Sequence, residues 1–280
     1  MSVKIIVGST CDVEEDIKKD LIVVPLHVTF GEEDFLDSID ITKDEFYERL
    51  ERKKEFPKTS QPTPMAFMEA YKKVIDNGDE AVVIVISSKL SGTYQSAKIA
   101  AKGLNDKIFI VDSLNVSNAE GALVDFAMKL VKEGKSAREI SEILEEVKKK
   151  LRLMVLVDTL EYLERGGRIS KTSAFVGGLF SVKVLLSMED GAIATAGKAK
   201  GIKNANNLFI REIEKRGSID FSMPIKLGYT GRDSSKIEKY LRETKNLWEC
   251  KIHSPEFIQI GSVVGTHTGP GALFLAYFSN

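Results

Sequence analysis

Four polar segments of this 280-residue chain carry the side chains that could do chemistry: residues 59–62, 87–93, 165–170 and 265–271. Together they supply hydroxyl groups, arginines, one histidine and many glycines, but no catalytic carboxylate. Glycine lets backbone amides approach a ligand closely, and the arginine fork matches a planar carboxylate or a phosphate. The four segments therefore indicate a binding site for an anion.

Ser91 and Gly92 stand where a buried strand turns into a helix. The apolar, β-branched run over 81–86 predicts the strand, residues 87–92 form a turn, and apolar residues then recur at helical spacing. In open α/β sheets ligands bind at such turns, because unpaired N–H groups and the helix dipole converge there. Ser91 can cap the helix or offer its hydroxyl to an anion, and for a lone serine the cap is the commoner role.

Thr59 lies in a polar segment that contains two prolines, Lys58-Thr59-Ser60-Gln61-Pro62-Thr63-Pro64. A residue that precedes proline is pushed out of the α region, so the chain is predicted to run extended up to Thr63. Thr63 and Pro64 then begin a helix as N-cap and first helical residue. The segment holds its hydroxyl groups in fixed positions, and a rigid linker and a binding site explain it equally well.

The fold class predicted from the alternation of strands and helices is α/β. Alternation at this spacing indicates βαβ units and a largely parallel sheet in a first domain, residues 1–158. The strands expected there are 3–7, 21–30 (with Pro25 at an edge or bulge), 81–86, 107–112 and 153–158, and residues 31–40 are expected to be irregular.

A second, smaller α+β domain is predicted over residues 159–280. The turn Glu189-Asp190-Gly191 between two apolar runs is typical of a hairpin, which indicates antiparallel pairing. Further strands are expected near 225–230, 249–252 and 258–264, followed by a Gly-rich loop over 265–271 and a final strand over 272–278. The apolar stretch 174–186 suits a hydrocarbon tunnel, although such a stretch is more often plain core.

Composition narrows the function classes. The formal net charge of −1, with acidic and basic residues interspersed, gives no support for a nucleic-acid partner. Cys11 and Cys250 are too few for a disulfide scaffold or a Cys-based metal site. The N-terminus does not resemble a signal peptide, and the apolar runs are too short for stable membrane insertion. A cytoplasmic location is the simplest expectation.

The motifs KTSQPTP (58–64), ISSKLSGTYQSA (86–97), DTLEYLERGGRIS (158–170) and GTHTGPGA (265–272) occur in an order that resembles the DegV family. These are fatty-acid-binding proteins that serve bacterial fatty acid kinase. The resemblance implies two domains that hold a long-chain fatty acid such as palmitate between them. It implies that Thr59 and Ser91, with Gly92 beside Ser91, bind the carboxyl group. By the same resemblance Arg168 and His267 lie at or near the head group and give it positive character.

The resemblance also implies a partner, the catalytic subunit of fatty acid kinase, to which the carboxyl group is presented in phospholipid metabolism. The chain itself is then a carrier rather than an enzyme, with no metal and no cofactor besides the bound fatty acid. One departure is that Gly8 stands where such proteins usually carry aspartate before Ser-Thr. No role is carried over to position 8.

Three other functions compete with the carrier. A hydrolase would use Ser91 as nucleophile and His267 as base, but Lys89-Leu90-Ser91-Gly92-Thr93 lacks the G-x-S-x-G elbow. A sugar- or triose-binding subunit like that of dihydroxyacetone kinase would hold a polar ligand in place of a hydrocarbon tail. A transcriptional regulator is disfavoured by the neutral charge and by the lack of a helix-turn-helix pattern.

Overall fold

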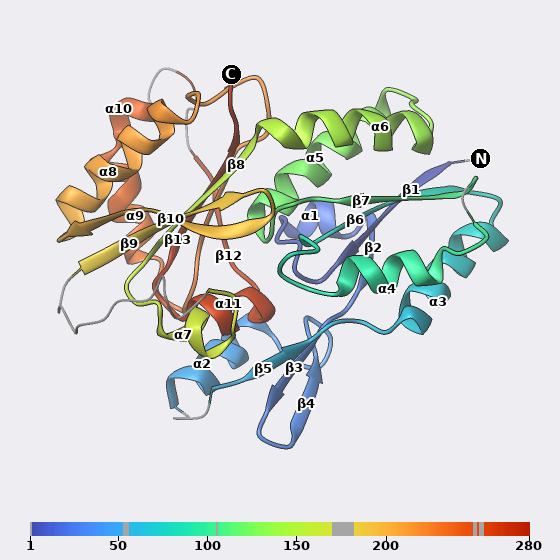
Figure 1. Ribbon diagram of the computed structural model, residues 1–280, viewed down its shortest axis with the longest axis horizontal. Coiled ribbons are helices and arrows are strands. Elements are labelled where there is room, and N and C mark those ends of the chain that lie inside the picture. The colour runs from blue at the N-terminus through green and yellow to red at the C-terminus, as the bar shows by residue number, and fades with distance from the viewer. Residues whose placement is uncertain (1, 53–55, 105, 170–181, 249–250, 252–254) are drawn as a thin grey trace.

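A four-stranded parallel sheet forms the first half of the computed structural model, which describes all residues except 1, 53–55, 105, 170–181, 249–250 and 252–254 (Figure 1). Its strand order is β2-β1-β6-β7, with β1 at Val3–Gly8, β2 at Leu21–Val24, β6 at Glu80–Val85 and β7 at Ile108–Asp112. All three strand pairs are parallel. The two central strands, β1 and β6, are largely buried on both faces, as their near-continuous apolar sequences predict.

Helices cover both faces of this sheet. Helices α3 (Pro64–Asp76) and α4 (Thr93–Ala100) pack on one face, against residues such as Ile6 and Val83. Helices α5 (Asn118–Lys132) and α6 (Ala137–Val147) pack on the other, against residues such as Ile5 and Val82. The expected cap of α3 is confirmed, since the Thr63 hydroxyl accepts a hydrogen bond from the Ala66 N–H group at 3.3 Å.

A six-stranded sheet forms the second half, in the order β10-β9-β8-β13-β11-β12. Its strands are β8 (Leu151–Val157), β9 (Val182–Glu189), β10 (Ala192–Lys200), β11 (Lys226–Tyr229), β12 (Phe257–Gln259) and β13 (Leu273–Phe278). Every pair is antiparallel except β11 with β12. The predicted hairpin joins β9 to β10, with positive φ angles at Asp190 and Gly191.

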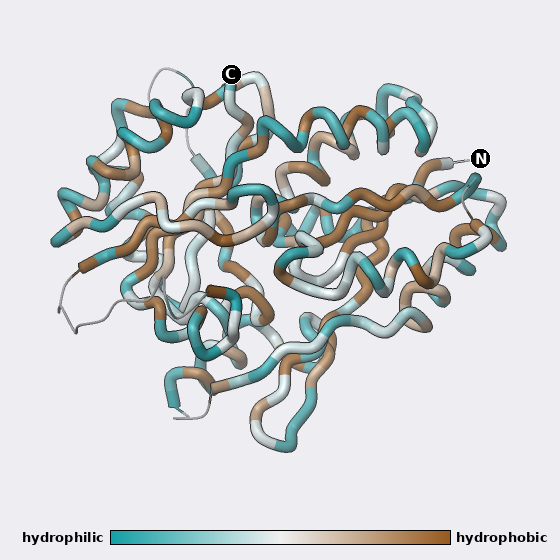
Figure 2. Tube along the Cα trace, viewed as in Figure 1, coloured by the Kyte–Doolittle hydropathy of each residue, from teal (hydrophilic) through white to brown (hydrophobic). Residues whose placement is uncertain are grey.

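Three helices cover one face of the six-stranded sheet: α8 (Ile202–Lys215), α9 (Ser235–Glu243) and α10 (Lys245–Trp248). Helix α5 packs against the other face, so it lies between the two large sheets. The hydropathy trace in Figure 2 shows the most apolar residues concentrated in the strands of both sheets. Among the described residues, no helix combines the length and the apolar character needed to cross a bilayer.

A smaller three-stranded sheet, β4-β3-β5, supports the region where the two halves meet. It consists of β3 (His27–Phe30), β4 (Glu33–Leu36) and β5 (Lys58–Ser60). Helices α2 (Lys43–Arg52), α7 (Glu161–Arg165) and α11 (Ser262–Thr268) lie close to it in Figure 1. Phe30, Phe46, Tyr47 and Val263 belong to one apolar cluster that joins this sheet to α2 and α11.

Several expected elements differ from those observed. The strand expected over 21–30 is two strands in different sheets, because Pro25 cannot continue the ladder. Residues 31–40, expected to be irregular, contain β4. The strand expected over 258–264 ends at Gln259, and α11 follows where a strand end and a loop were expected. The strand expected at 249–252 falls largely outside the described residues.

The chain passes from one sheet to the other before residue 158. Strand β8 pairs with β9 and β13 of the six-stranded sheet, although the sequence placed it in the parallel sheet of the first half. That assignment of β8 was wrong, because its apolar run suits a central strand of either sheet. The domain division at 158/159 stays a prediction.

Candidate functional site

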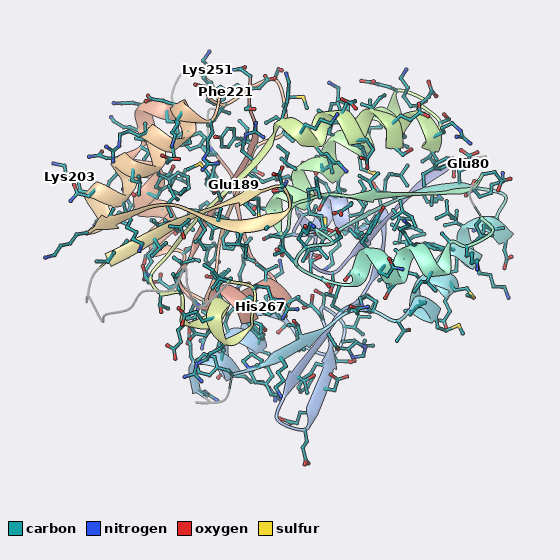
Figure 3. The ribbon with its side chains drawn as sticks, viewed as in Figure 1. Glu80, Glu189, Lys203, Phe221, Lys251 and His267 are labelled. Carbon is teal, nitrogen blue, oxygen red and sulfur yellow. The ribbon has the colours of Figure 1, made fainter. Side chains whose placement is uncertain are left out.

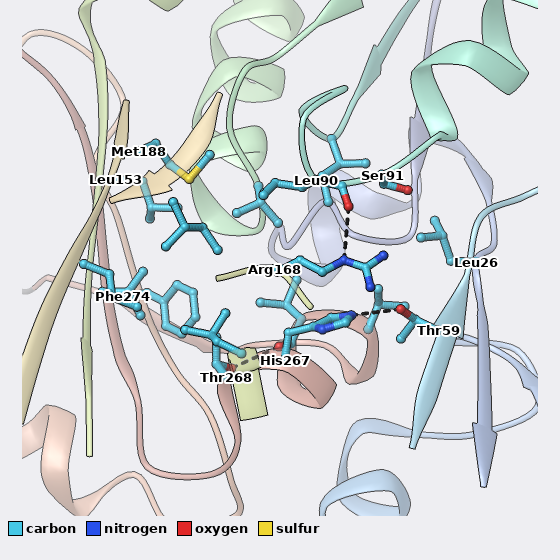
Figure 4. A pocket seen from close by; sticks show the side chains of 18 of the residues that line it. Leu26, Thr59, Leu90, Ser91, Leu153, Arg168, Met188, His267, Thr268 and Phe274 are labelled. Carbon is cyan, nitrogen blue, oxygen red and sulfur yellow. Dashed lines mark hydrogen bonds between the residues drawn. The ribbon is translucent and has the colours of Figure 1, made fainter. Parts of the chain in front are cut away.

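A cavity of about 320 Å³ is lined by residues of the six-stranded sheet, of β5, of the loop that follows β6, and of α11. All five residues singled out from the sequence line it: Thr59, Ser91, Gly92, Arg168 and His267. Figure 4 shows Thr59, Ser91, Arg168 and His267 near one another, with Leu153, Met188 and Phe274 farther along the cavity. The cavity thus has a polar end and an apolar end.

Thr59 and His267 meet at the polar end. Thr59 lies on β5 and His267 on the last turn of α11, and the Thr59 hydroxyl is hydrogen-bonded to His267 Nε2 at 2.9 Å. The other ring nitrogen, Nδ1, is buried and has no hydrogen-bond partner in the described part of the chain. In the view of Figure 3 His267 lies beside α7 and α11, away from Lys203 and Glu80.

His267 is neutral at neutral pH, contrary to the positive character expected from the sequence. Burial, followed by the positive charge of Arg168, lowers the pKa of the imidazole to about 4. Gly166 packs directly against the ring, because a Cβ atom at position 166 would lie 2.1 Å from Nδ1. The polar end therefore combines a neutral imidazole with one guanidinium cation.

Arg168 is held by backbone carbonyl groups. Its Nε donates to the Leu90 carbonyl at 3.2 Å, and its Nη1 donates to the Gly166 carbonyl at 2.6 Å. Within the described ranges no carboxylate is ion-paired with Arg168, so the structural salt bridge that would otherwise explain this arginine does not appear there. An anion in the cavity would supply the missing counter-charge.

Ser91 makes a local hydrogen bond at the start of α4 and also lines the cavity. Its hydroxyl accepts a hydrogen bond from the Thr93 N–H group at 3.3 Å at the start of α4, and it lies 2.9 Å from the Thr93 hydroxyl. Because Ser91 also lines the cavity, its hydroxyl proton can serve either Thr93 or a ligand. Gly8, the departure from the DegV pattern, is not among the described residues that line the cavity.

Gly92 lies in close contact with the side-chain amide of Gln61, a residue the sequence did not single out. A Cβ atom on residue 92 would lie 1.9 Å from the Gln61 side-chain oxygen. The Gln61 amide donates to the Ser96 hydroxyl at 3.0 Å, which ties β5 to α4 across the polar end of the cavity. Gln61 stands in the TSQP motif, so the motif was the signal that could have found it.

Strands build the apolar end as far as the structure describes it. Leu153 and Val155 of β8, Phe274 of β13, and Met188 and Ile193 of the β9–β10 hairpin line this part. Of the stretch expected to form a tunnel, 174–186, residues 174–181 lie outside the described part. The described segment contributes Leu186 to the cavity.

The arrangement does not match a serine-hydrolase triad. Thr59, and not Ser91, is hydrogen-bonded to His267, and the described residues place no carboxylate on His267 Nδ1. The described residues contain no cluster of three or more His, Cys, Asp or Glu side chains able to hold a metal ion. The groups gathered here suit binding of an anion that carries an apolar part.

Comparison with known proteins identifies the family. The model of the DegV family matches residues 2–280. This chain belongs to the DegV family. A DegV domain-containing protein of Caldanaerobacter subterraneus is 34% identical over 275 residues, which are 96% of each chain. A DegV domain-containing protein of Clostridium perfringens is 32% identical over 279 residues, which are 98% of each chain.

Solved structures of DegV proteins share the whole fold. A DegV family protein from Thermus thermophilus, described for its fatty acid binding, is 30% identical with a TM-score of 0.87, and 99% of this chain and 100% of that one are covered. A stearic acid-binding protein from Eubacterium ventriosum is 28% identical with a TM-score of 0.86, and 100% of this chain and 98% of that one are covered. DegV of Bacillus subtilis, a fatty acid binding protein, is 29% identical with a TM-score of 0.83, and both chains are fully covered.

Proposed function

We propose that this DegV protein binds a long-chain fatty acid, with its carboxylate at Thr59, Ser91, Arg168 and His267 and its hydrocarbon tail along the apolar wall. The observation that carries the proposal is the joining of a polar end and an apolar wall in a single cavity. A sugar or triose would leave that wall without a matching partner, so the cavity favours a ligand with a tail.

The energetics of such a ligand suit the cavity. Burying about fourteen methylene groups at about 0.8 kcal/mol each gives ~11 kcal/mol of gross transfer free energy. Association and ordering costs then reduce the net binding free energy. The carboxylate must find partners inside, since an unpaired buried charge would cancel much of this gain. The guanidinium of Arg168 and the hydroxyls of Thr59 and Ser91 provide those partners.

Charge also favours a monoanion. Arg168 carries one positive charge, and His267 is neutral because burial and Arg168 lower its pKa to about 4. A single carboxylate balances this charge, whereas a neutral ester would leave the guanidinium uncompensated. The site should therefore prefer the free acid over an ester of the same chain length.

The proposal extends to a partner. We infer that the protein presents the carboxyl group to a separate fatty acid kinase, which forms the acyl phosphate. The motifs shared with the DegV family support this role, as does the missing carboxylate partner of His267 among the described residues, which disfavours a hydrolase. Purified protein given ATP and palmitate without a partner should form no acyl phosphate, and its formation would contradict the carrier role.

The decisive test compares palmitate with methyl palmitate by calorimetric titration. The Thr59→Ala, Ser91→Ala double variant should lose about 1–3 kcal/mol of acid binding per donor and keep its affinity for the ester. A control that removes two hydroxyls outside the cavity lining, Ser141→Ala with Ser222→Ala, should behave as wild type. The assignment is wrong if wild type does not prefer the acid, or if the double variant keeps the full preference.

A further inference from the structure

Helix α11 has only seven residues, Ser262–Thr268, yet it carries four residues that line the cavity: Val263, Val264, His267 and Thr268. A helix of two turns is not stable by itself in water. Its position must be set by the structure around it. Residues 259–262, which lead into α11, show how this is done.

Two buried carboxylates hold the start of α11. The Gly261 N–H group donates to Asp12 Oδ1 at 2.8 Å, and the Ser262 hydroxyl donates to Asp37 Oδ1 at 2.6 Å. Asp12 is 3% exposed and Asp37 is 1% exposed. Neither aspartate is among the described residues that line the cavity.

Helix α2 supplies two further contacts. Lys43 donates to the Gln259 carbonyl at 2.6 Å, and the Tyr47 hydroxyl donates to the Ile260 carbonyl at 3.0 Å. Lys43 also lies 3.7 Å from Asp12 Oδ1. We call Asp12, Asp37, Lys43 and Tyr47 the α11 anchor.

Burying the two carboxylates of the α11 anchor costs free energy. Burial raises the pKa of Asp12 and of Asp37, so each carboxylate is less stable here than in water. Buried ionic groups are often no better for stability than apolar residues of similar size, and in some proteins they instead fix one arrangement of the chain. Here the arrangement that they fix leads, within one and a half turns of helix, to His267.

We propose that Asp12 and Asp37 are positioning residues that fix α11 and thereby hold His267 against the Thr59 hydroxyl. The idea rests on the proposed function, because it assigns the two aspartates to recognition of the carboxylate without contact with it. Loss of either contact frees the first turn of α11. The imidazole then moves relative to β5, and the polar end loses its geometry while the apolar wall, built largely by strands, stays in place.

The test compares Asp12→Ala and Asp37→Ala with Glu120→Gln. Glu120 is fully buried and accepts from the Thr10 hydroxyl at 3.0 Å, and among the described residues no hydrogen bond joins it to residues 259–262. The two aspartate variants should reduce the preference for palmitate over methyl palmitate by about tenfold, with ester affinity unchanged. Glu120→Gln should lower stability only.

Two further measurements separate positioning from general damage. Asp12→Asn keeps an acceptor for the Gly261 N–H group and should recover most of the acid preference, which also covers the case that the alanine variant does not fold. In a His267→Ala background, Asp12→Ala and Asp37→Ala should have no additional effect on acid preference. An equal effect of Glu120→Gln, or full additivity with His267→Ala, would overturn the proposal.

A readout without ligand keeps this proposal distinct from the proposed function. His267 is one of only three histidines in the chain, so its imidazole nitrogen signals can be assigned by comparison with a His267→Asn variant. They should shift in ligand-free Asp37→Ala and stay unchanged in Glu120→Gln. If they shift but wild type shows no acid preference, the proposed function fails and the anchor stands. If they do not shift, the anchor is wrong.

Discussion

Replacing Gly166 by alanine tests the contact between the imidazole and the backbone that packs against it. Gly166 has φ −75° and ψ −9°, which any residue adopts, so alanine brings no backbone strain. Its Cβ atom would lie 2.1 Å from His267 Nδ1 and 2.8 Å from Cε1. Non-bonded atoms need about 3.5 Å, so the ring must retreat by roughly 1 Å or more.

That retreat disturbs the hydrogen bond at the polar end. Gly166 lies against Nδ1 and the Thr59 hydroxyl lies 2.9 Å from Nε2, so a displaced ring cannot keep the present geometry of this hydrogen bond. We expect palmitate to bind about fivefold more weakly, which corresponds to the loss of about 1 kcal/mol. Overpacking should also lower the free energy of unfolding by about 1–3 kcal/mol.

Gly167→Ala is the matched control. Gly167 has φ +69° and no atom within 4 Å of its would-be Cβ, so alanine there costs about 1 kcal/mol of backbone strain and touches no ring. Titration with palmitate and urea unfolding should show both glycine variants less stable, with weakened binding in Gly166→Ala alone. If Gly166→Ala is more stable than wild type and binds palmitate normally, the packing described here is incorrect.

Three other outcomes follow from the structure. Gly92→Ala should weaken palmitate binding, because its Cβ would lie 1.9 Å from the Gln61 amide oxygen. Adding Gln61→Ala should restore much of the affinity. If it does not, the weaker binding has a cause other than this contact. His267→Asn should make the free energy of unfolding less sensitive to acid, which urea titrations between pH 4 and 6.5 would measure. The folded pKa of His267, about 4, is below its usual value of 6.5. Wild type therefore takes up a proton on unfolding in this pH range and loses stability as the pH falls. Lys226→Met should lower the free energy of unfolding in urea by about 3 kcal/mol, because Lys226 is 5% exposed and pairs with Asp125 at 2.6 Å and with Glu14. A loss below about 1 kcal/mol would show that these carboxylates find other partners.

The polar end of the cavity was predictable because its residues stand in short motifs with local causes. Thr59 precedes two prolines that keep its segment extended, and this segment became β5. Ser91 and Gly92 follow β6, whose short apolar and β-branched sequence predicts a buried strand. Each motif fixes its own backbone, so the residue types at the site could be named before their distances were known.

Helix α11 could not be predicted, because its cause is not local. The sequence from Ile258 to Val264 is short, apolar and β-branched, and such a run fits a strand as well as a helix. The contact that favours a helix here comes from Asp12, about 250 positions away. Its carboxylate accepts a hydrogen bond from the Gly261 N–H group, directly before the helix begins. The charge of His267 was missed for the same reason, since its pKa depends on burial by distant segments.

The apolar wall was hidden by its likeness to ordinary core. In β8, Leu153 and Val155 face the side of the sheet that packs on α5, whereas Met154 and Leu156 face α8, so the alternation shows only that both faces are buried. Strand β13 repeats the pattern, with Phe274 on the α5 side. The same side of these strands is packed against α5 over part of its length and lines the cavity over the rest. No difference in residue type marks the change, because a wall that receives a hydrocarbon tail and a wall that receives a helix need the same apolar side chains. The two parts of the wall differ in whether α5 packs against them.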